Sequence, residues 1–356
     1  MSALSIMVKP VSGACNMHCA YCFYSDVMSH RKTHVYPHMS EQTLEILVQR
    51  VFRYADNQVS FFFQGGEPTL AGLPFFEALI RFEQIYNVRN LPVFNAVQTN
   101  AYALSDEMIS FFARENFLLG VSLDGDRFAH DHLRLDQSGL PTFDRVCTNL
   151  NRLTHAGVEF NILCVVNKYV AQRARDVFEN LAPYRYLQFI ACLDDFDGHK
   201  TNYSLTEQSY LHFLKTCFDL YFEAFQAGRP VSIRCFDNYL SILLGLPPES
   251  CAMFGECGQY LLIEADGSVY PCDFYVLDKS SCQFRKKTTL YRRITFCSGS
   301  MQTLPLVSLM PQRLQTRTQS ANWLKSLVRL LSGILYLCIF SIGGNGQSNT
   351  RKVLNL

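Results

Sequence analysis

Short apolar segments alternate with longer amphipathic segments from about residue 4 to about residue 200. The short segments are rich in β-branched and aromatic residues, which favour strands, and the longer ones repeat apolar residues at helical spacing. The pattern predicts strands over residues 6–9, 59–64, 93–99, 117–123, 159–166 and 187–191. It predicts helices over residues 41–54, 74–86, 105–114, 143–156, 171–181 and 206–226.

Six strand–helix repeats in this order indicate an α/β fold built from parallel βα units. Six such units can curve into an open, partial barrel. Functional residues in parallel α/β folds gather at the carboxyl ends of the strands. Further along, residues 261–265 and 268–271 predict a hairpin around Asp266 and Gly267.

The strongest chemical motif directly follows the first predicted strand. Cys15, Cys19 and Cys22 form a C-x3-C-x2-C loop. Three thiolates so closely spaced can bind three irons of a [4Fe-4S] cluster and leave the fourth iron open. Two alternatives remain: a zinc site that would need one more ligand, such as His18, and ordinary cysteines of the core.

This loop and four later motifs resemble the radical S-adenosylmethionine (radical SAM) superfamily. The later motifs are Gly65-Gly66-Glu67-Pro68, Gln98-Thr99-Asn100, Ser122-Leu123-Asp124-Gly125, and His130-Asp131 with Arg134. The resemblance implies a partial (β/α)6 barrel of the TIM-like type and a cluster held by the three cysteines, with SAM as cofactor. It also implies cofactor contacts by Tyr21, Gly66, Glu67, Ser122, Arg134 and Leu193.

A narrower resemblance, over about residues 4–278, is to the anaerobic sulfatase-maturating enzymes. It rests on the runs from Lys9 to Tyr24, from Phe63 to Leu70, from Cys192 to Asp194 and from Cys251 to Tyr275. The resemblance implies oxidation of a Cys or Ser in a sulfatase polypeptide to Cα-formylglycine, with a flavodoxin- or ferredoxin-like electron donor. Asp273 would be the proton acceptor, and Tyr24, Gln64 and Gln98 would contact the substrate peptide.

The resemblance further implies ligands of an auxiliary [4Fe-4S] cluster at Cys251, Cys257 and Cys272. The later cysteines lack the family's spacing, so the auxiliary-cluster domain is expected to be truncated and its cluster incomplete. We therefore expect a barrel over residues 1–235, the start of this domain over 236–278, and an aberrant tail over 279–356.

Charge separates this tail from the rest of the chain. All 31 acidic residues lie in residues 1–278, whereas 12 of the 32 Lys and Arg residues lie in 279–356. We hypothesise that the tail is translated out of frame, which leaves the activity of this copy open. Residues 330–344 are apolar but too short to predict a membrane span. The basic residues lack the aromatic interleaving of a nucleic-acid site, so no nucleic-acid partner is predicted.

The remaining composition agrees with a cytoplasmic enzyme. The chain is 48% hydrophobic and 18% charged, as in ordinary globular domains, and its first ten residues contain no apolar signal segment. Fourteen cysteines in such a chain point to metal binding or catalysis before disulfides. The competing functional hypotheses are another peptide-modifying radical SAM enzyme and an inactive truncated homologue.

Overall fold

The six expected strands lie side by side in one parallel sheet. We analysed a computed structural model, which describes residues 4–249, 253 and 260–276. The strands are β1 (Leu4–Val8), β3 (Val59–Phe63), β4 (Val93–Thr99), β5 (Leu118–Ser122), β7 (Phe160–Val166) and β8 (Tyr186–Ala191). They pair in this order, each parallel to the next, which confirms the predicted βα units.

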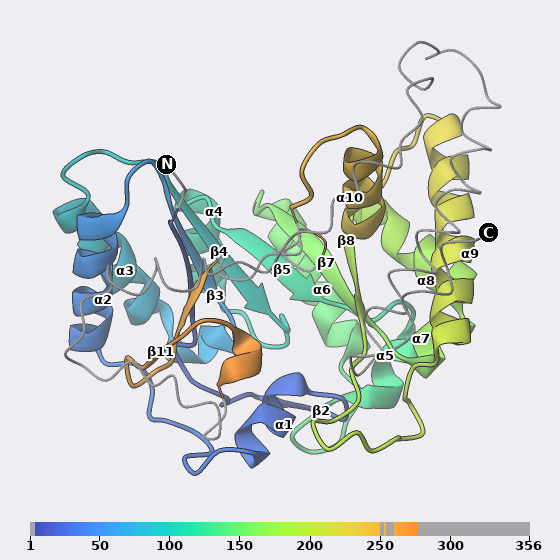
Figure 1. The fold of residues 1–356 in the computed structure, drawn as a ribbon, viewed down its shortest axis with the longest axis horizontal. Coiled ribbons are helices and arrows are strands. Elements are labelled where there is room, and N and C mark those ends of the chain that lie inside the picture. The colour runs from blue at the N-terminus through green and yellow to red at the C-terminus, as the bar shows by residue number, and fades with distance from the viewer. Residues whose placement is uncertain (1–3, 250–252, 254–259, 277–356) are drawn as a thin grey trace, which may run out of the picture.

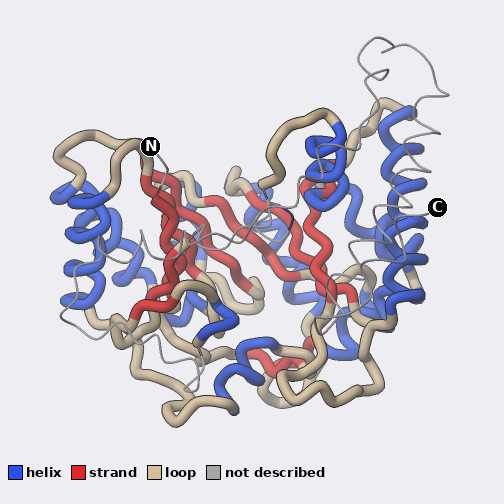
Figure 2. The backbone as a smooth tube through the Cα atoms, in the orientation of Figure 1, coloured by secondary structure: helices blue, strands red, loops and turns tan. Residues whose placement is uncertain are grey.

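Helices cover the outside of this curved sheet (Figure 1). They are α2 (Glu41–Tyr54), α3 (Leu73–Tyr86), α4 (Asp106–Arg114), α6 (Phe143–His155), α7 (Lys168–Gln172), α8 (Ala174–Leu181) and α9 (Glu207–Gln226). One boundary differs from the prediction, because the helix expected over residues 171–181 is two helices that meet at Arg173. The strands thus form an open half-barrel with a helical outer layer (Figure 2).

The core lies between the sheet and these helices. Phe61 and Phe63 point outward from β3 and are buried, and Phe63 packs edge-on against Phe76 of α3 at 5.5 Å between ring centroids. Phe76 in turn contacts Phe112 of α4 at 5.4 Å. Burial of such rings is the main stabilising contribution to a core of this kind. The outer face of the sheet is therefore fixed by packing, which leaves the loops at the strand ends free to build a site.

Several short elements have no counterpart in the predicted pattern. They are α1 (Phe23–Ser29), β2 (Met17–Cys19), α5 (Arg127–Leu133), β6 (Arg134–Asp136), β9 (Ser232–Ile233), α10 (Arg234–Leu243), and the 3-10 turns η1 (Pro68–Ala71), η2 (Ala182–Tyr184) and η3 (Asp273–Tyr275). Most are too short to show a hydrophobic period. β2 and β6 form a separate antiparallel pair that lies below the sheet in Figure 1.

The predicted hairpin near residue 266 is confirmed. β10 (Leu261–Ile263) and β11 (Val269–Tyr270) pair antiparallel, and β10 also pairs parallel with β1 in the register Ile6↔Leu261. The sheet therefore has nine described strands, and its last elements lie beside its first. The domain division at residues 235 and 278 stays a prediction. A boundary at residue 235 would fall inside a helix, α10.

The hypothesis about the tail concerns residues 279–356, which lie outside the described part of the chain, as does the apolar segment 330–344. Among the described helices, none combines the length and the apolar character that a membrane span requires.

Candidate active site

The three cysteines of the C-x3-C-x2-C loop occupy three different local elements. Cys15 lies in the loop after β1, Cys19 ends β2, and Cys22 is the N-cap residue of α1. Cys15 and Cys19 each interact electrostatically with Cys22, which places the three thiols in one neighbourhood. His18, by contrast, is exposed and lies between Met17 and Cys19 on the opposite face of β2.

Two glycines at the end of β3 hold this loop close to the sheet. Gly66 has a φ of +56°, and a Cβ atom there would lie 2.1 Å from the carbonyl oxygen of Ala14. The next amide, Glu67 N–H, donates to that same carbonyl at 2.8 Å. Only glycine allows this approach. Gly66 is therefore a structural support of the cysteine loop, in addition to the cofactor contact predicted for it.

The carboxylate of Glu67 is buried, and both of its oxygens accept hydrogen bonds from the chain. Oε1 accepts from the Thr69 amide at 3.2 Å, the Thr69 hydroxyl at 2.7 Å and the Thr99 hydroxyl at 2.8 Å. Oε2 accepts from the amide of Asn100 at 2.7 Å. Glu67 thus joins the ends of β3 and β4. Asn100 also contacts the cysteine loop, because its Nδ2 lies 3.6 Å from the sulfur of Cys15.

Arg134 lies opposite Cys19, the second cysteine of the loop. It pairs with Cys19 in the ladder between β2 and β6, and its Nη1 donates to the hydroxyl of Tyr21 at 3.0 Å. That hydroxyl also donates to Asp124, which follows β5. Tyr21 is therefore held by protein groups through its polar end. The Nε–H of Arg134 is buried and has no acceptor among the described residues, so this donor is available to a ligand.

The thiols of Cys15 and Cys19 are partly desolvated. Burial raises the pKa of Cys19 to about 12 and also raises the pKa of Cys15. The nearby guanidinium of Arg134 acts in the opposite direction on both thiols. Metal ligation requires the thiolate form, so binding of a positively charged group here releases protons.

These residues fit an iron–sulfur cluster better than a single metal ion. A zinc ion needs its ligand atoms at about 2.0–2.3 Å from one point. Within the described ranges, no three His, Cys, Asp or Glu side chains converge in that way. A cubane is larger and takes each thiolate on a different iron. With His18 turned away, the zinc alternative has no fourth ligand in the loop.

A second cluster of polar residues surrounds Asp273 in η3. The Nε2 group of Gln64 donates to Asp273 Oδ2 at 2.8 Å and to the Tyr24 hydroxyl at 2.5 Å. The Tyr24 hydroxyl donates to the same carboxylate oxygen at 3.2 Å. Three residues that were predicted separately from sequence therefore lie in direct contact. They come from α1, the end of β3 and η3.

Lys9 completes this cluster and was not among the predicted site residues. Its Nζ lies 3.1 Å from Asp273 Oδ1 and 4.4 Å from the centre of the Tyr24 ring, and the residue is only 2% exposed. Gly65 makes room for it, because a Cβ atom at that position would lie 2.7 Å from Lys9 Cγ. Lysine is almost never fully buried unless it is paired with an acidic group. In the sequence, the one signal for Lys9 was its position directly after β1, at a strand end where site residues gather.

The remaining predicted residues lie around these two clusters. Ser122 ends β5 and is half-buried, and Gln98 on β4 has no hydrogen bond to the Asp273 cluster among the described residues. Leu193 follows β8 and is 44% exposed. The sulfur of Cys272 lies 3.2 Å from the Tyr260 hydroxyl. Cys251 and Cys257, the two other predicted auxiliary ligands, lie outside the described residues.

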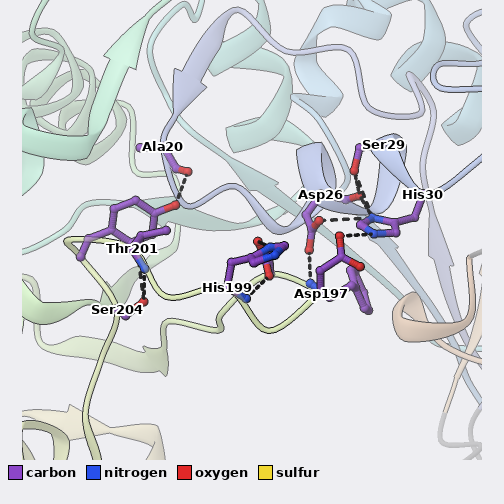
Figure 3. Close-up of polar contacts among 11 residues, drawn as sticks. Ala20, Asp26, Ser29, His30, Asp197, His199, Thr201 and Ser204 are labelled. Atoms are coloured by element: carbon purple, nitrogen blue, oxygen red, sulfur yellow. Dashed lines mark hydrogen bonds and ion pairs between the residues drawn. The ribbon is translucent and has the colours of Figure 1, made fainter.

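The chain after β8 is tied to the cysteine loop and to α1 (Figure 3). The Phe196 amide donates to the Asp26 carboxylate at 2.8 Å, and His30 Nε2 lies 3.3 Å from Asp197 Oδ2. Tyr203 donates from its hydroxyl to the carbonyl of Ala20, between the second and third cysteines, at 2.8 Å. This segment therefore closes one side of the site.

Comparison with known proteins agrees with this geometry. Residues 10–180 match the radical SAM superfamily. A cysteine-type anaerobic sulfatase-maturating enzyme of Clostridium novyi (strain NT) is 43% identical over 293 residues, which is 81% of this chain and 78% of that protein. An enzyme of the same description from Clostridium perfringens (strain 13 / Type A) is 43% identical over 283 residues, or 78% of this chain and 76% of that protein.

A solved structure described as native anSMEcpe with bound AdoMet and Cp18Cys peptide superposes with a TM-score of 0.74. It is 43% identical in sequence, and the match covers 78% of this chain and 76% of that chain. The chain therefore belongs to the anaerobic sulfatase-maturating enzymes of the radical SAM superfamily, oxidoreductases that use a [4Fe-4S] cluster and SAM.

Proposed function

We propose that this chain oxidises a Cys or Ser residue of a sulfatase polypeptide to Cα-formylglycine. The observation that supports this most directly is the contact between Asp273, Gln64 and Tyr24 close to the cysteine loop. Tyr24 is two residues from Cys22, so the start of α1 both carries a predicted cluster ligand and contacts the carboxylate of Asp273. When bound, the cluster and SAM supply a radical that removes a hydrogen atom from the target residue.

In this proposal Cys15, Cys19 and Cys22 hold the cluster, and Arg134 offers its free Nε–H to an acidic group of the cofactor. Asp273 accepts the proton of the target thiol or hydroxyl as a general base. Its Oδ2 accepts a hydrogen bond from Gln64, and its Oδ1 lies 3.1 Å from the Nζ of Lys9, so the carboxylate is held in place through both oxygens.

The electron donor belongs to the proposal as well. A small flavodoxin- or ferredoxin-like protein would supply the reducing electron. Cys251, Cys257 and Cys272 would supply three ligands of an auxiliary cluster on the route of the second electron, and the sequence predicts that this cluster is incomplete. Chemical reduction with dithionite can replace the donor in a first experiment.

The test is turnover of a sulfatase-derived peptide that contains one target Cys, with anaerobically reconstituted protein, SAM and dithionite. Hydrazide trapping followed by mass spectrometry detects the aldehyde. We expect aldehyde with the wild-type chain and none with a triple Cys15→Ala, Cys19→Ala, Cys22→Ala variant. Release of 5′-deoxyadenosine with a different modification of the peptide would contradict this function and favour another peptide-modifying activity.

A further inference from the structure

His130 and Asp131, neighbours on α5, both contact Thr142, the N-cap residue of α6. The Oδ1 atom of Asp131 accepts from the amides of Thr142 and Phe143, each at 2.9 Å. His130 is buried, and its Nε2 lies 3.0 Å from the hydroxyl oxygen of Thr142, which is buried as well. Two side chains of α5 therefore fix the position of the Thr142 hydroxyl.

The direction of each hydrogen bond around His130 follows from its partners. Its Nδ1 accepts from the amide of Asp124 at 3.2 Å, so this nitrogen carries no hydrogen. Burial lowers the pKa of His130 well below its usual range, and the nearby Arg134 acts in the same direction, so the imidazole is neutral. A neutral imidazole then has its hydrogen on Nε2 and donates it to Thr142. The Thr142 hydroxyl in turn donates to the backbone carbonyl of Arg134, at 2.7 Å.

These bonds are part of a closed network, because Arg134 and Asp124 also meet through their side chains. Arg134 Nη1 donates to the hydroxyl of Tyr21 at 3.0 Å, and that hydroxyl donates to the carboxylate of Asp124. The Arg134 network therefore runs through Asp124, His130, Thr142, Arg134 and Tyr21 back to Asp124. Its members other than Tyr21 are buried, so a polar group that loses its partner here stays unsatisfied.

Two further contacts connect the Arg134 network to the rest of the protein. The Oδ1 atom of Asp124 accepts from the amide of Val165, in β7, at 2.8 Å. The amide of Ala20 donates to the carbonyl of Leu133 at 2.9 Å, which places the start of β6 beside the cysteine loop. Arg134 is thus held between the end of β5, the strand β7 and the cysteine loop.

We propose that His130 and Thr142 are positioning residues, which hold Arg134 so that its free Nε–H is presented to SAM. This Nε–H is buried and lacks an acceptor within the described part of the chain. His130 and Thr142 act through the backbone carbonyl of Arg134. A donor that is already held in place loses less conformational entropy when its ligand binds, so the network raises the affinity for SAM. Their role rests on the cofactor contact proposed for Arg134.

The test measures SAM binding to anaerobically reconstituted protein, by equilibrium dialysis with radiolabelled SAM and without a reductant, so that SAM is not consumed. Thr142→Val removes the hydroxyl and keeps the shape of the side chain, and SAM should bind about 10-fold more weakly. Thr142→Ser restores the hydroxyl and should restore wild-type affinity. Thr148→Val, which removes an exposed hydroxyl from α6, is the matched control and should bind SAM as the wild type does. Iron and sulfide per chain should be equal in all of these variants.

Arg134→Lys shows whether Thr142 acts through Arg134. Lysine keeps the positive charge but has no Nε–H of this kind, so SAM should bind about 10-fold more weakly. In Arg134→Lys/Thr142→Val, SAM should bind as in Arg134→Lys alone, because no Nε–H is left to position. Independent losses that multiply to about 100-fold would give Thr142 a merely structural role and overturn the proposal. Wild-type affinity in Thr142→Val or in Arg134→Lys, or a loss of iron in Thr142→Val, would overturn it as well.

A second pair of variants tests His130 and leaves Thr142 intact, which decides the question if Thr142→Val does not fold. In His130→Gln the longer amide can still donate to Thr142, whereas in His130→Asn the side chain can accept from the Asp124 amide but is too short to reach Thr142. SAM affinity should stay at the wild-type value with Gln and fall about 10-fold with Asn. Equal affinities in the two variants would overturn the role of His130. No peptide is present in these measurements, so their failure is distinguishable from a failure to form aldehyde.

Discussion

The Nζ atom of Lys9 lies 3.1 Å from Oδ1 of Asp273, and both side chains are buried. One residue follows the first strand of the sheet, and the other follows the last. The ion pair is possible because β10 lies next to β1. It connects the proposed base to the strand that leads into the cysteine loop, so the geometry of the base depends on closure of the sheet.

Replacement of this lysine by an apolar residue leaves a buried carboxylate without its cation. We expect Lys9→Met to lower the free energy of unfolding by about 3–5 kcal/mol, as is usual when one partner of a buried pair is removed. Chemical denaturation under anaerobic conditions measures the change. Lys215→Met, on the exposed surface of α9, is the control and should stay within about 0.5 kcal/mol of the wild type.

The double variant Lys9→Met/Asp273→Asn separates the ion pair from packing. If the loss comes from the unpaired charge, the double variant should be more stable than Lys9→Met, with a coupling of about 0.5–3 kcal/mol. Additive losses would show that the Lys9 stem contributes through packing alone.

Asp273→Asn keeps the size of the side chain and removes the proposed base. We expect aldehyde formation to fall by about 10²- to 10⁴-fold, the usual contribution of a general base. Release of 5′-deoxyadenosine should continue, because the cysteine loop and Arg134 are unchanged. Liquid chromatography of both products measures the ratio. Parallel loss of deoxyadenosine and aldehyde would assign Asp273 a structural role instead.

Gly66→Ala should disturb the cysteine loop. The new methyl group would lie 2.1 Å from the carbonyl oxygen of Ala14, at a φ of +56°. We expect a clear drop in iron and sulfide per chain after anaerobic reconstitution.

Gly139→Ala is a matched control for this variant. Gly139 has a φ of +77°, so the alanine would carry a similar backbone strain, but no atom lies within 4 Å of the position that its methyl group would take. This variant should keep the wild-type iron content. Equal iron in both variants would mean that the close approach at Gly66 does not support the loop.

Glu83 on α3 gives a pH-dependent prediction away from the site. Burial raises the pKa of this carboxyl to about 7, although Asn95 donates to both of its oxygens. The folded state then binds a proton that the unfolded state has lost between about pH 4.5 and pH 7, so stability falls as pH rises through this window. Glu83→Gln should therefore stabilise the protein by about 3 kcal/mol at pH 8 and by less than about 1 kcal/mol at pH 5. Thermal unfolding at the two pH values measures the difference, and an equal effect at both would contradict the assignment.

The strands of the barrel are predictable from sequence because each is a continuous apolar run. Residues 93–99 are found as predicted, and the other five strands are shifted by one or two residues at their ends. The prediction of one helix over residues 171–181 is wrong at Arg173, where one helix ends and the next begins. Arg173 adopts φ −119° and ψ 33°, and its guanidinium pairs with Asp126, a tertiary contact that no local pattern reports.

The site is predictable in part, for a similar reason. Motifs at strand ends locate Tyr24, Gln64 and Asp273 separately, but their mutual contact depends on the pairing of β10 with β1. Lys9 was missed because a lysine next to a proline looks like an ordinary solvated residue. Its burial follows from a partner near the other end of the described chain.

The pairing of β10 with β1 also affects the order in which the parts of the protein fold. The cysteine loop leaves the ribosome early, whereas Asp273 and the strand β10 leave after all six βα units. Contacts between segments so distant in sequence form slowly, because the chain must close a long loop before they gain any stability. A nascent chain can therefore present the three thiols long before it has the proposed base, and the docking of β10 on β1 is the step that brings Asp273 to the loop of the three cysteines.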